Sequence, residues 1–296
     1  MAIFLGLLVA LFYGSGDFLG GIATKRSPAT SVVVLSYVVS TAVVVVCLAL
    51  WTTIGNLPGP TGHDLALGAA SGFIAPVALG FLYWGLATGR MSVVAPITAV
   101  VAAVVPLAWG LAFGERPSAV ALAGVVVALV AVGLISGAPA HEDHPEDLPT
   151  KPLAQVIPSA VVSGVGFGAI FVLLGNTTED AGLWPMLTAR PLAVALTAIV
   201  ASAIALRGHR PVRPVIVPVR ASWWFAAGAG VLDVSANGIY IAAAHSGLLS
   251  IVAVLSSLYP ASTVVLARVV LGERLHRVQL AGLALAACGI VAMSAG

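Results

Sequence analysis

Three ionisable side chains lie inside long apolar stretches of this sequence, at Asp17, Arg190 and Asp233. A charged residue at the centre of a membrane-spanning helix costs about 3 kcal/mol, whereas a Leu or Ile there gains only roughly 0.5 kcal/mol. Residues this costly usually bind a polar solute, an ion or a proton inside a polar central cavity. The alternative is a buried ion pair that only fixes how the helices pack.

Asp233 is the strongest candidate of the three. It follows Arg220, which we expect at a membrane surface, by thirteen residues, and this places it about 20 Å along a helix, near the middle of a span. Asn237 and Tyr240 follow at the fourth and seventh positions after it. One helical face therefore offers a carboxylate, an amide and a phenol, which are enough to orient a polar substrate.

Asp17 and Arg190 add two charges whose partners the sequence leaves open. Asp17 precedes Lys25 by eight residues, so we expect it nearer the surface as an entrance residue, with Tyr13 on the same helical face. The natural partner of Arg190 is an anion or the carboxylate of a substrate, but it could equally pair with Asp233 or Asp17. An aspartate paired with Arg190 stays ionised and cannot carry protons, so the unpaired aspartate is the candidate for proton coupling.

The elements that position these residues follow from composition. The chain has 296 residues, of which 60% are hydrophobic and only 8% charged, whereas soluble domains carry about a quarter charged residues. This excludes a water-soluble fold. A span needs about 20 apolar residues, and with short connections about 30, so the length accommodates about ten spans. We expect them at residues 2–23, 29–51, 64–87, 92–113, 118–137, 154–175, 183–206, 221–245, 248–271 and 277–295.

The first stretch has no basic residues before it, and we interpret it as a span rather than a signal peptide. Basic residues then orient the chain, because they concentrate in cytoplasmic connections. The connections after even-numbered spans contain only Arg116. We therefore predict a multi-pass protein of the plasma membrane with both termini outside. The connections after odd-numbered spans contain Lys25, Arg26, Arg90, Lys151, Arg207, Arg210, Arg213, Arg220, Arg274 and Arg277.

One long polar stretch divides the chain almost in half. Residues 138–153 are rich in acids and prolines, which is typical of a solvated linker, here predicted on the cytoplasmic side. The alternative is a metal site at His141 and His144, but their spacing does not place two ligands on one helical face. We therefore predict no metal site, and three segments: a five-helix repeat at 1–137, the linker at 138–153, and a second five-helix repeat at 154–296.

A sequence repeat at an offset of 158 residues supports this division. Each half has five spans, an odd number, so the second half must enter the membrane in the opposite direction. The fold class is therefore an all-α membrane protein with ten transmembrane helices as two inverted five-helix repeats. Such repeats characterise secondary transporters, whose site at the repeat interface opens alternately to either side. The matching segments are Gly114–Arg116 with Gly272–Arg274, Leu122–Gly124 with Leu280–Gly282, and Ser92–Ala95 with Ser250–Ala253.

Several other residues have simpler interpretations. Glu115 and its repeat equivalent Glu273 each follow a glycine at a helix end, so we expect them to cap the helices that begin next. His245 is expected to be an exposed residue at the end of a span. Small-residue pairs let helices approach closely, either within the chain or in a homodimer, which stays an open alternative. These pairs are Gly16 with Gly20 and Gly164 with Gly168.

The sequence resembles the drug/metabolite transporter superfamily, specifically the EamA-type transporters with two EamA domains. The resemblance covers nearly the whole chain and rests on the ten-span length, the duplicated glutamate, the following Gly124 and Gly282, and Leu258-Tyr259-Pro260. It implies a secondary transporter of small polar metabolites, an exporter of amino acids or related compounds, working by alternating access and driven by a gradient, with protons as a candidate coupling ion.

Two other functions stay open at this point. One is a flippase or carrier for lipid-linked or nucleotide-linked substrates. The other is a non-transporting membrane scaffold or receptor, in which Asp17, Arg190 and Asp233 would pair with one another. An enzyme is not expected, because the sequence has no nucleotide-binding loop and no nucleophile beside a base. We also expect no cofactor and no nucleic-acid partner, because the basic residues flank spans, where orientation explains them.

Overall fold

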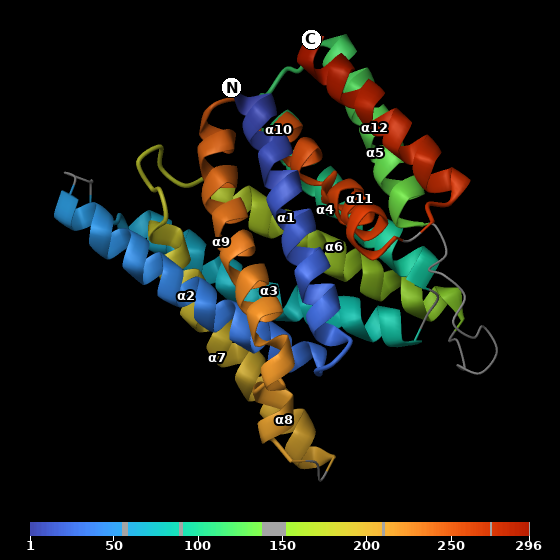
Figure 1. The fold of residues 1–296 in the computed structure, drawn as a ribbon. Coiled ribbons are helices and arrows are strands. Elements are labelled where there is room, and N and C mark those ends of the chain that lie inside the picture. The colour runs from blue at the N-terminus through green and yellow to red at the C-terminus, as the bar shows by residue number, and fades with distance from the viewer. Residues whose placement is uncertain (55–58, 89–90, 138–151, 209–210, 273, 296) are drawn as a thin grey trace.

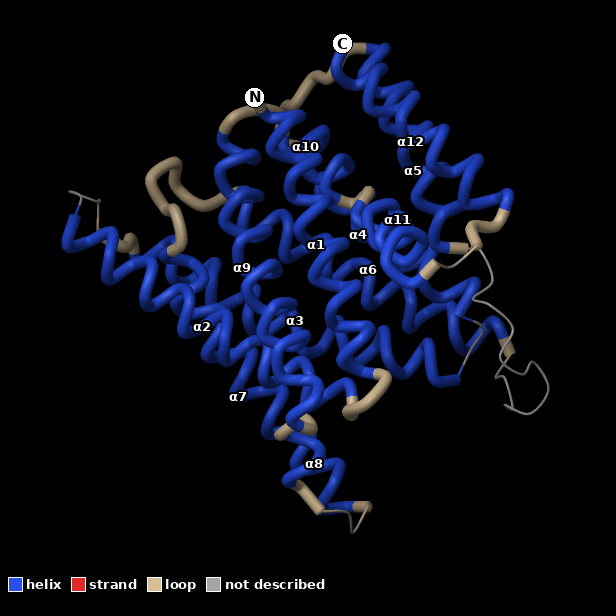
Figure 2. The backbone as a smooth tube through the Cα atoms, in the orientation of Figure 1, coloured by secondary structure: helices blue, strands red, loops and turns tan. Residues whose placement is uncertain are grey.

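The computed structural model describes residues 1–54, 59–88, 91–137, 152–208, 211–272 and 274–295. Within these residues the chain is helical and contains no strand (Figures 1 and 2). Ten spans in this part of the chain are long and apolar enough to cross a membrane. The helices are α1 Ala2–Thr24, α2 Ala29–Ile54, α3 Gly62–Thr88, α4 Met91–Ala112, α5 Ala119–Ser136, α6 Leu153–Gly175, α7 Trp184–Arg207, α8 Arg213–Ile216, α9 Trp223–His245, α10 Leu249–Ser256, α11 Tyr259–Leu271 and α12 Arg277–Ala295.

The predicted spans are confirmed, with ends that differ by a few residues. The predicted eighth and ninth spans, 221–245 and 248–271, separate at Ser246 and Gly247, between α9 and α10. The ninth span differs from the prediction because it consists of two helices, α10 and α11. The connection between α7 and α9 also contains the short helix α8 and a single 3-10 turn, Arg220–Ser222.

The break in the ninth span has a local cause. Pro260 lies in the first turn of α11 and has no N–H to donate to the preceding turn. Next to the break, the hydroxyl groups of Ser256 and Ser257 donate to the carbonyl oxygens of Val252 and Val254, at 2.8 and 2.7 Å. Discontinuous helices of this kind occur in secondary transporters, where they surround the substrate site.

The 158-residue repeat is visible in three dimensions where α5 and α12 pack side by side (Figure 1). A methyl group added at Gly124 would lie 2.8 Å from Gly289 O and Met293 N, and one added at Gly282 would lie 3.1 Å from Ala131 O and 2.7 Å from Ile135 Cγ1. Adding 158 to 131 and 135 gives 289 and 293, so the two contacts are equivalent. Because the start of each helix meets the end of the other, the repeats run in opposite directions.

Each repeat inserts its first helix into the other repeat. α1 packs against α9, α10 and α11, whereas α6 packs against α3 and α4. Both chain ends lie at the same end of the bundle (Figure 1), which we call the terminus side. The opposite end carries the connections from α1 to α2, α7 to α9 and α11 to α12, and we call it the linker side. The interface between the repeats therefore runs through α1 and α6.

The two predicted glycine pairs behave differently. Gly164 and Gly168 both face α4, where added methyl groups would lie within 3 Å of Thr98 O and Ala102 O. Gly16 faces α9, but a methyl group at Gly20 would meet no described atom within 4 Å. The prediction is therefore confirmed for α6 and wrong for Gly20, which points away from the packed face of α1.

Candidate functional site at the repeat interface

Arg190 on α7 and Asp233 on α9 form an ion pair in the interior of the bundle. Arg190 Nη2 lies 2.7 Å from Asp233 Oδ2, and the side chains are 8% and 34% exposed. The guanidinium group also lies over the ring of Tyr37 on α2, with Cζ 5.4 Å from the ring centroid, a cation–π contact. Of the partners left open by the sequence, the structure selects Asp233. Arg190 Nε has no hydrogen-bond partner among the described residues.

Two close helix contacts hold this ion pair in place. On α3, Gly72 lies against the backbone of Ala189, so α7 approaches closely just before its arginine. On α9, Gly230 lies against the backbone of Ser36, and the hydroxyl of Ser40 donates to Gly230 O at 2.7 Å. The pair therefore rests on two backbone-to-backbone approaches that a larger side chain at either glycine would disrupt.

Asn237 lies beside the ion pair, as its spacing from Asp233 predicts. Its side-chain amide donates to the backbone oxygen of Asp233 at 2.7 Å and lies 3.5 Å from Oδ1 of the carboxylate. Tyr240, one turn further along α9, is fully buried, and its hydroxyl donates to Phe171 O at 3.1 Å. The structure therefore brings Asn237 to the charged pair and places Tyr240 in an apolar cluster next to it.

Asp17 and Tyr13 come to the same region from α1. Asp17 is exposed although it lies within the span, and it has no ion-pair partner in the described part of the chain. Its neighbour Gly16 packs against Leu232 and Asp233 of α9. The ring of Tyr13 meets Phe171 and Tyr259 edge to face, at centroid distances of 6.1 and 6.5 Å. Because Arg190 and Asp233 pair with each other, Asp17 is the acidic side chain of this cluster that has no ion-pair partner among the described residues.

The sequence prediction missed the aromatic residues that surround these charges. Tyr37, Phe171 and Tyr259 come from α2, α6 and α11 and contact Arg190 or Tyr13. Tyr37 and Tyr259 carry polar hydroxyl groups inside apolar stretches of the sequence, and this pattern could have indicated that they belong to the site. Nothing in the sequence distinguishes Phe171 from other core residues.

Burial of the two halves of the ninth span differs sharply. Seven of the eight residues of α10 are buried, whereas no residue of α11 is buried. On the terminus side of the ion pair, Phe171 and Tyr240 stack at 4.7 Å within a core that also contains Val9 and Leu174. The interior is therefore closed on the terminus side and less tightly packed toward the linker side, where Asp17 is exposed.

Glu115 fastens this closed side. Its carboxylate accepts hydrogen bonds from the backbone N–H groups of Leu249 and Ser250 at 2.6 and 3.0 Å, at the start of α10. The expected capping role is therefore correct in kind but wrong in target. Ser118 already caps the helix next in sequence, α5, by accepting from Ala121 N at 3.0 Å. Glu115 instead joins the first repeat to the second. Its equivalent, Glu273, lies outside the described residues.

Two more polar contacts close the same side. The carboxylate of Asp64 accepts hydrogen bonds from the N–H and hydroxyl of Thr178, both at 2.8 Å. His245 is half-buried rather than exposed, because its two ring nitrogens lie 2.8 Å from Ile241 O and 2.6 Å from Thr177 O. Both partners are carbonyl oxygens, which only accept hydrogen bonds, so a ring N–H can donate to either of them. These contacts attach the connection after α6 to α3 and α9.

Most of the predicted linker, residues 138–151 with His141 and His144, lies outside the described residues. In the remaining parts of the chain, no group of three or more His, Cys, Asp or Glu side chains is arranged to hold a metal ion. The candidate site is therefore the cluster of Asp17, Arg190, Asp233 and Asn237 with its surrounding tyrosines.

Comparison with known proteins agrees with this architecture. A crystal structure of another protein superposes with a TM-score of 0.73 at 18% identity, covering 99% of this chain and 96% of that chain, which shows a shared fold. An uncharacterized protein of Methanocaldococcus jannaschii is 29% identical over 103 residues, 35% of this chain and 72% of its own. The family model of the EamA-like transporter family matches residues 1–137 and 154–295. The chain is therefore a multi-pass membrane transporter that belongs to the EamA-like transporter family.

Proposed function

We propose that this transporter exports small polar metabolites, namely amino acids or related compounds that carry an amino group, by alternating access at the repeat interface. Membership of the family supports transport of a small molecule across a bilayer. The antiparallel packing of α5 and α12 supports the inverted-repeat symmetry on which alternating access depends.

One observation carries the proposal: an exposed, unpaired aspartate lies beside a neutral ion pair at the centre of the repeat interface. Asp17 can accept hydrogen bonds from a substrate ammonium group, and Tyr13 and Tyr259 can flank it with aromatic rings. A substrate carboxylate would compete with Asp233 for Arg190, whose Nε has no hydrogen-bond partner in the part of the chain that the structure describes. A zwitterion therefore matches the charges of this cluster at both of its ends.

The conformation supports loading from the linker side. The terminus side is closed by the Phe171–Tyr240 stack and by the Glu115 cap on α10, whereas Asp17 is exposed. The basic connections of the linker side assign it to the cytoplasm. In the orientation that we propose, both termini are outside and the opening faces the cytoplasm, the side from which an exporter binds its substrate.

In this proposal, Asp17 is the residue that binds and releases the coupled proton. Asp233 forms an ion pair with Arg190 at 2.7 Å, so a proton bound to Asp233 would disrupt this pair. Asp17 has no such partner among the described residues, and it can alternate between a proton and a substrate ammonium group. The unpaired state of Asp17 also disfavours the scaffold alternative, in which the three charged residues would neutralise one another.

The test is transport by purified protein in liposomes preloaded with unlabelled amino acids. Uptake of a labelled amino acid by exchange is expected for the wild type and is expected to be lost in Asp17→Asn. Glu179→Gln, on the exposed connection after α6, removes one carboxylate elsewhere and serves as the matched control. Equal exchange by Asp17→Asn and the control would refute the role given to Asp17.

A further inference from the structure

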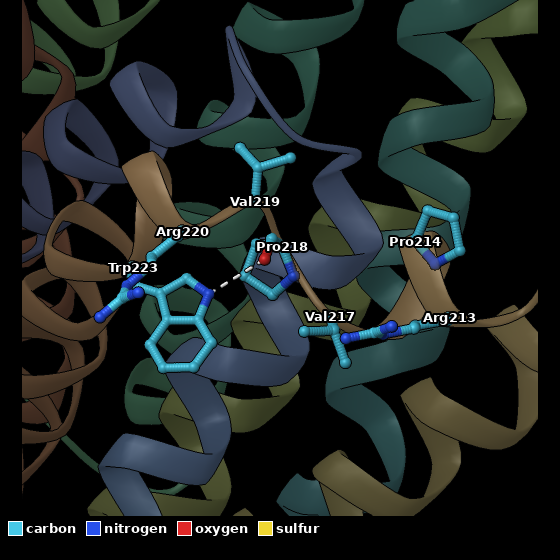
Figure 3. A pocket seen from close by; sticks show the side chains of 7 residues that line it. All are labelled: Arg213, Pro214, Val217, Pro218, Val219, Arg220 and Trp223. Carbon is cyan, nitrogen blue, oxygen red and sulfur yellow. Dashed lines mark hydrogen bonds between the residues drawn. The ribbon is translucent and has the colours of Figure 1, made fainter.

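The connection between α7 and α9 forms a recess on the linker side that the transport proposal does not use. Its volume is about 650 Å³. Two arginines, two prolines, two valines and Trp223 line it, all from the short segment that includes α8 and the start of α9 (Figure 3). The recess lies in the connection where α7 ends and α9 begins. We therefore expect it near the depth at which lipid headgroups meet water.

The charge of the recess is strongly positive. Arg213 and Arg220 are both exposed, and neither forms an ion pair in the described part of the chain. The sequence has no Asp or Glu at all from residue 181 to residue 232, so no neighbouring acid in the segment can neutralise them. Such a recess attracts an anion, and arginine forks suit the oxygen atoms of a phosphate group.

The backbone that carries these arginines is held in place. The indole N–H of Trp223 donates to Pro218 O at 3.0 Å (Figure 3). The turn between α1 and α2 and the start of α2 fix the segment further. Ser27 Oγ in the turn accepts from Val219 N at 3.0 Å, and the hydroxyl of Thr30 in α2 donates to Val215 O at 2.9 Å. Because the segment is preorganised, a ligand does not have to order it on binding.

Apolar side chains beside the arginines indicate which kind of phosphate fits. Val217, Val219 and Trp223 are 43%, 50% and 47% exposed, and Trp224 is 87% exposed. Exposed tryptophans are typical of the membrane–water interface, and the apolar surface would contact acyl chains or the glycerol backbone. A free phosphate ion would gain nothing from these groups. We propose that this recess binds the phosphate headgroup of an anionic phospholipid in the leaflet on the linker side.

The orientation of the chain supports this occupant. In the sequence, the connections after odd-numbered spans contain ten of the eleven basic residues found in the connections. This predicts that the linker side faces the cytoplasmic leaflet, where anionic lipids attract polybasic segments. The segment that lines the recess is also hydrogen-bonded to the end of α1, because Ser222 Oγ accepts from the hydroxyl of Ser27 and donates to Ala23 O. A bound lipid would therefore stabilise the ends of both α1 and α9, the helices that supply Asp17 and Asp233.

Native mass spectrometry of the purified full-length protein in detergent, titrated with phosphatidylglycerol or phosphatidylcholine, tests the proposal. Each of Arg213→Gln and Arg220→Gln should weaken phosphatidylglycerol binding about fivefold, and the double variant about 25-fold. Arg207→Gln is the matched control, because it removes the same charge from an exposed position at the end of α7 that does not line the recess. It should change binding little.

Three results would overturn the proposal, and none depends on transport activity. If Arg207→Gln weakened binding as much as Arg213→Gln, only the general surface charge would attract the lipid. If phosphatidylcholine bound as tightly as phosphatidylglycerol, the arginines would not select an anionic headgroup. If millimolar inorganic phosphate displaced phosphatidylglycerol while chloride at the same ionic strength did not, the recess would be a site for free phosphate.

Discussion

Glu115→Gln should open the terminus side of the transporter. The Glu115 carboxylate accepts two hydrogen bonds, from Leu249 N and Ser250 N, and hydrogen bonds to a charged group contribute about 1.5–3 kcal/mol each. Glutamine keeps one acceptor oxygen and loses the charge, so we expect the closed state to lose about 1.5–3 kcal/mol. This corresponds to a shift of about 10- to 150-fold in the equilibrium between closed and open forms.

Distances between spin labels at Val120 and Ser246 would measure this shift, because both positions are exposed and lie on either side of the contact. A population with longer distances should appear in Glu115→Gln. Arg116→Gln is the matched control, since the contacts that Arg116 makes among the described residues are with the carbonyl oxygens of Leu111 and Glu115, in its own repeat. An unchanged distance distribution in Glu115→Gln would refute the view that this cap holds the two repeats together.

Further variants test the interior in thermal unfolding experiments in detergent. Asp233→Asn should destabilise the protein by about 3 kcal/mol, because Arg190 keeps an uncompensated buried charge; adding Arg190→Met should restore part of this loss, and a lack of recovery would contradict the pairing. Tyr240→Phe removes the hydrogen bond to the backbone on α6 and should cost about 1 kcal/mol; no change in unfolding would mean that this bond does not stabilise the closure. Gly72→Val would push α7 away from α3 and should cost about 1–3 kcal/mol, whereas Gly20→Val, which meets no described atom, should cost less; equal costs would contradict the close contact.

Features with a periodic or repeated signature could be predicted from the sequence. The hydrophobic stretches predicted the ten spans. The Gly-Glu-Arg repeat predicted the symmetry between the halves, which is seen in the equivalent contacts of Gly124 and Gly282 where α5 crosses α12. The position of Asn237 beside Asp233 also followed, because both lie on one helix and the helical period determines their spacing. These features depend on one segment at a time or on a pattern that occurs twice.

Features that depend on contacts between distant segments could not be predicted. Arg190 had three possible partners, and only the approach of α7 to α9 selected Asp233. Glu115 was assigned to the nearest helix in sequence, but the chain fold brings it to α10, more than 130 residues away. His245 was expected to be exposed, because it lies at the end of a span. Its contact with Thr177 could not be foreseen, since it depends on the path of the connection after α6.

Exchange of labelled amino acids in proteoliposomes, measured across a range of pH with and without an imposed proton gradient, tests the central claim most directly. The account predicts that the wild type exchanges an amino acid and responds to the proton gradient. It also predicts that Asp17→Asn loses both activities while remaining folded in thermal unfolding. Transport by Asp17→Asn that kept the wild-type rate and the wild-type response to protons would contradict the assignment of substrate and proton binding to the repeat interface.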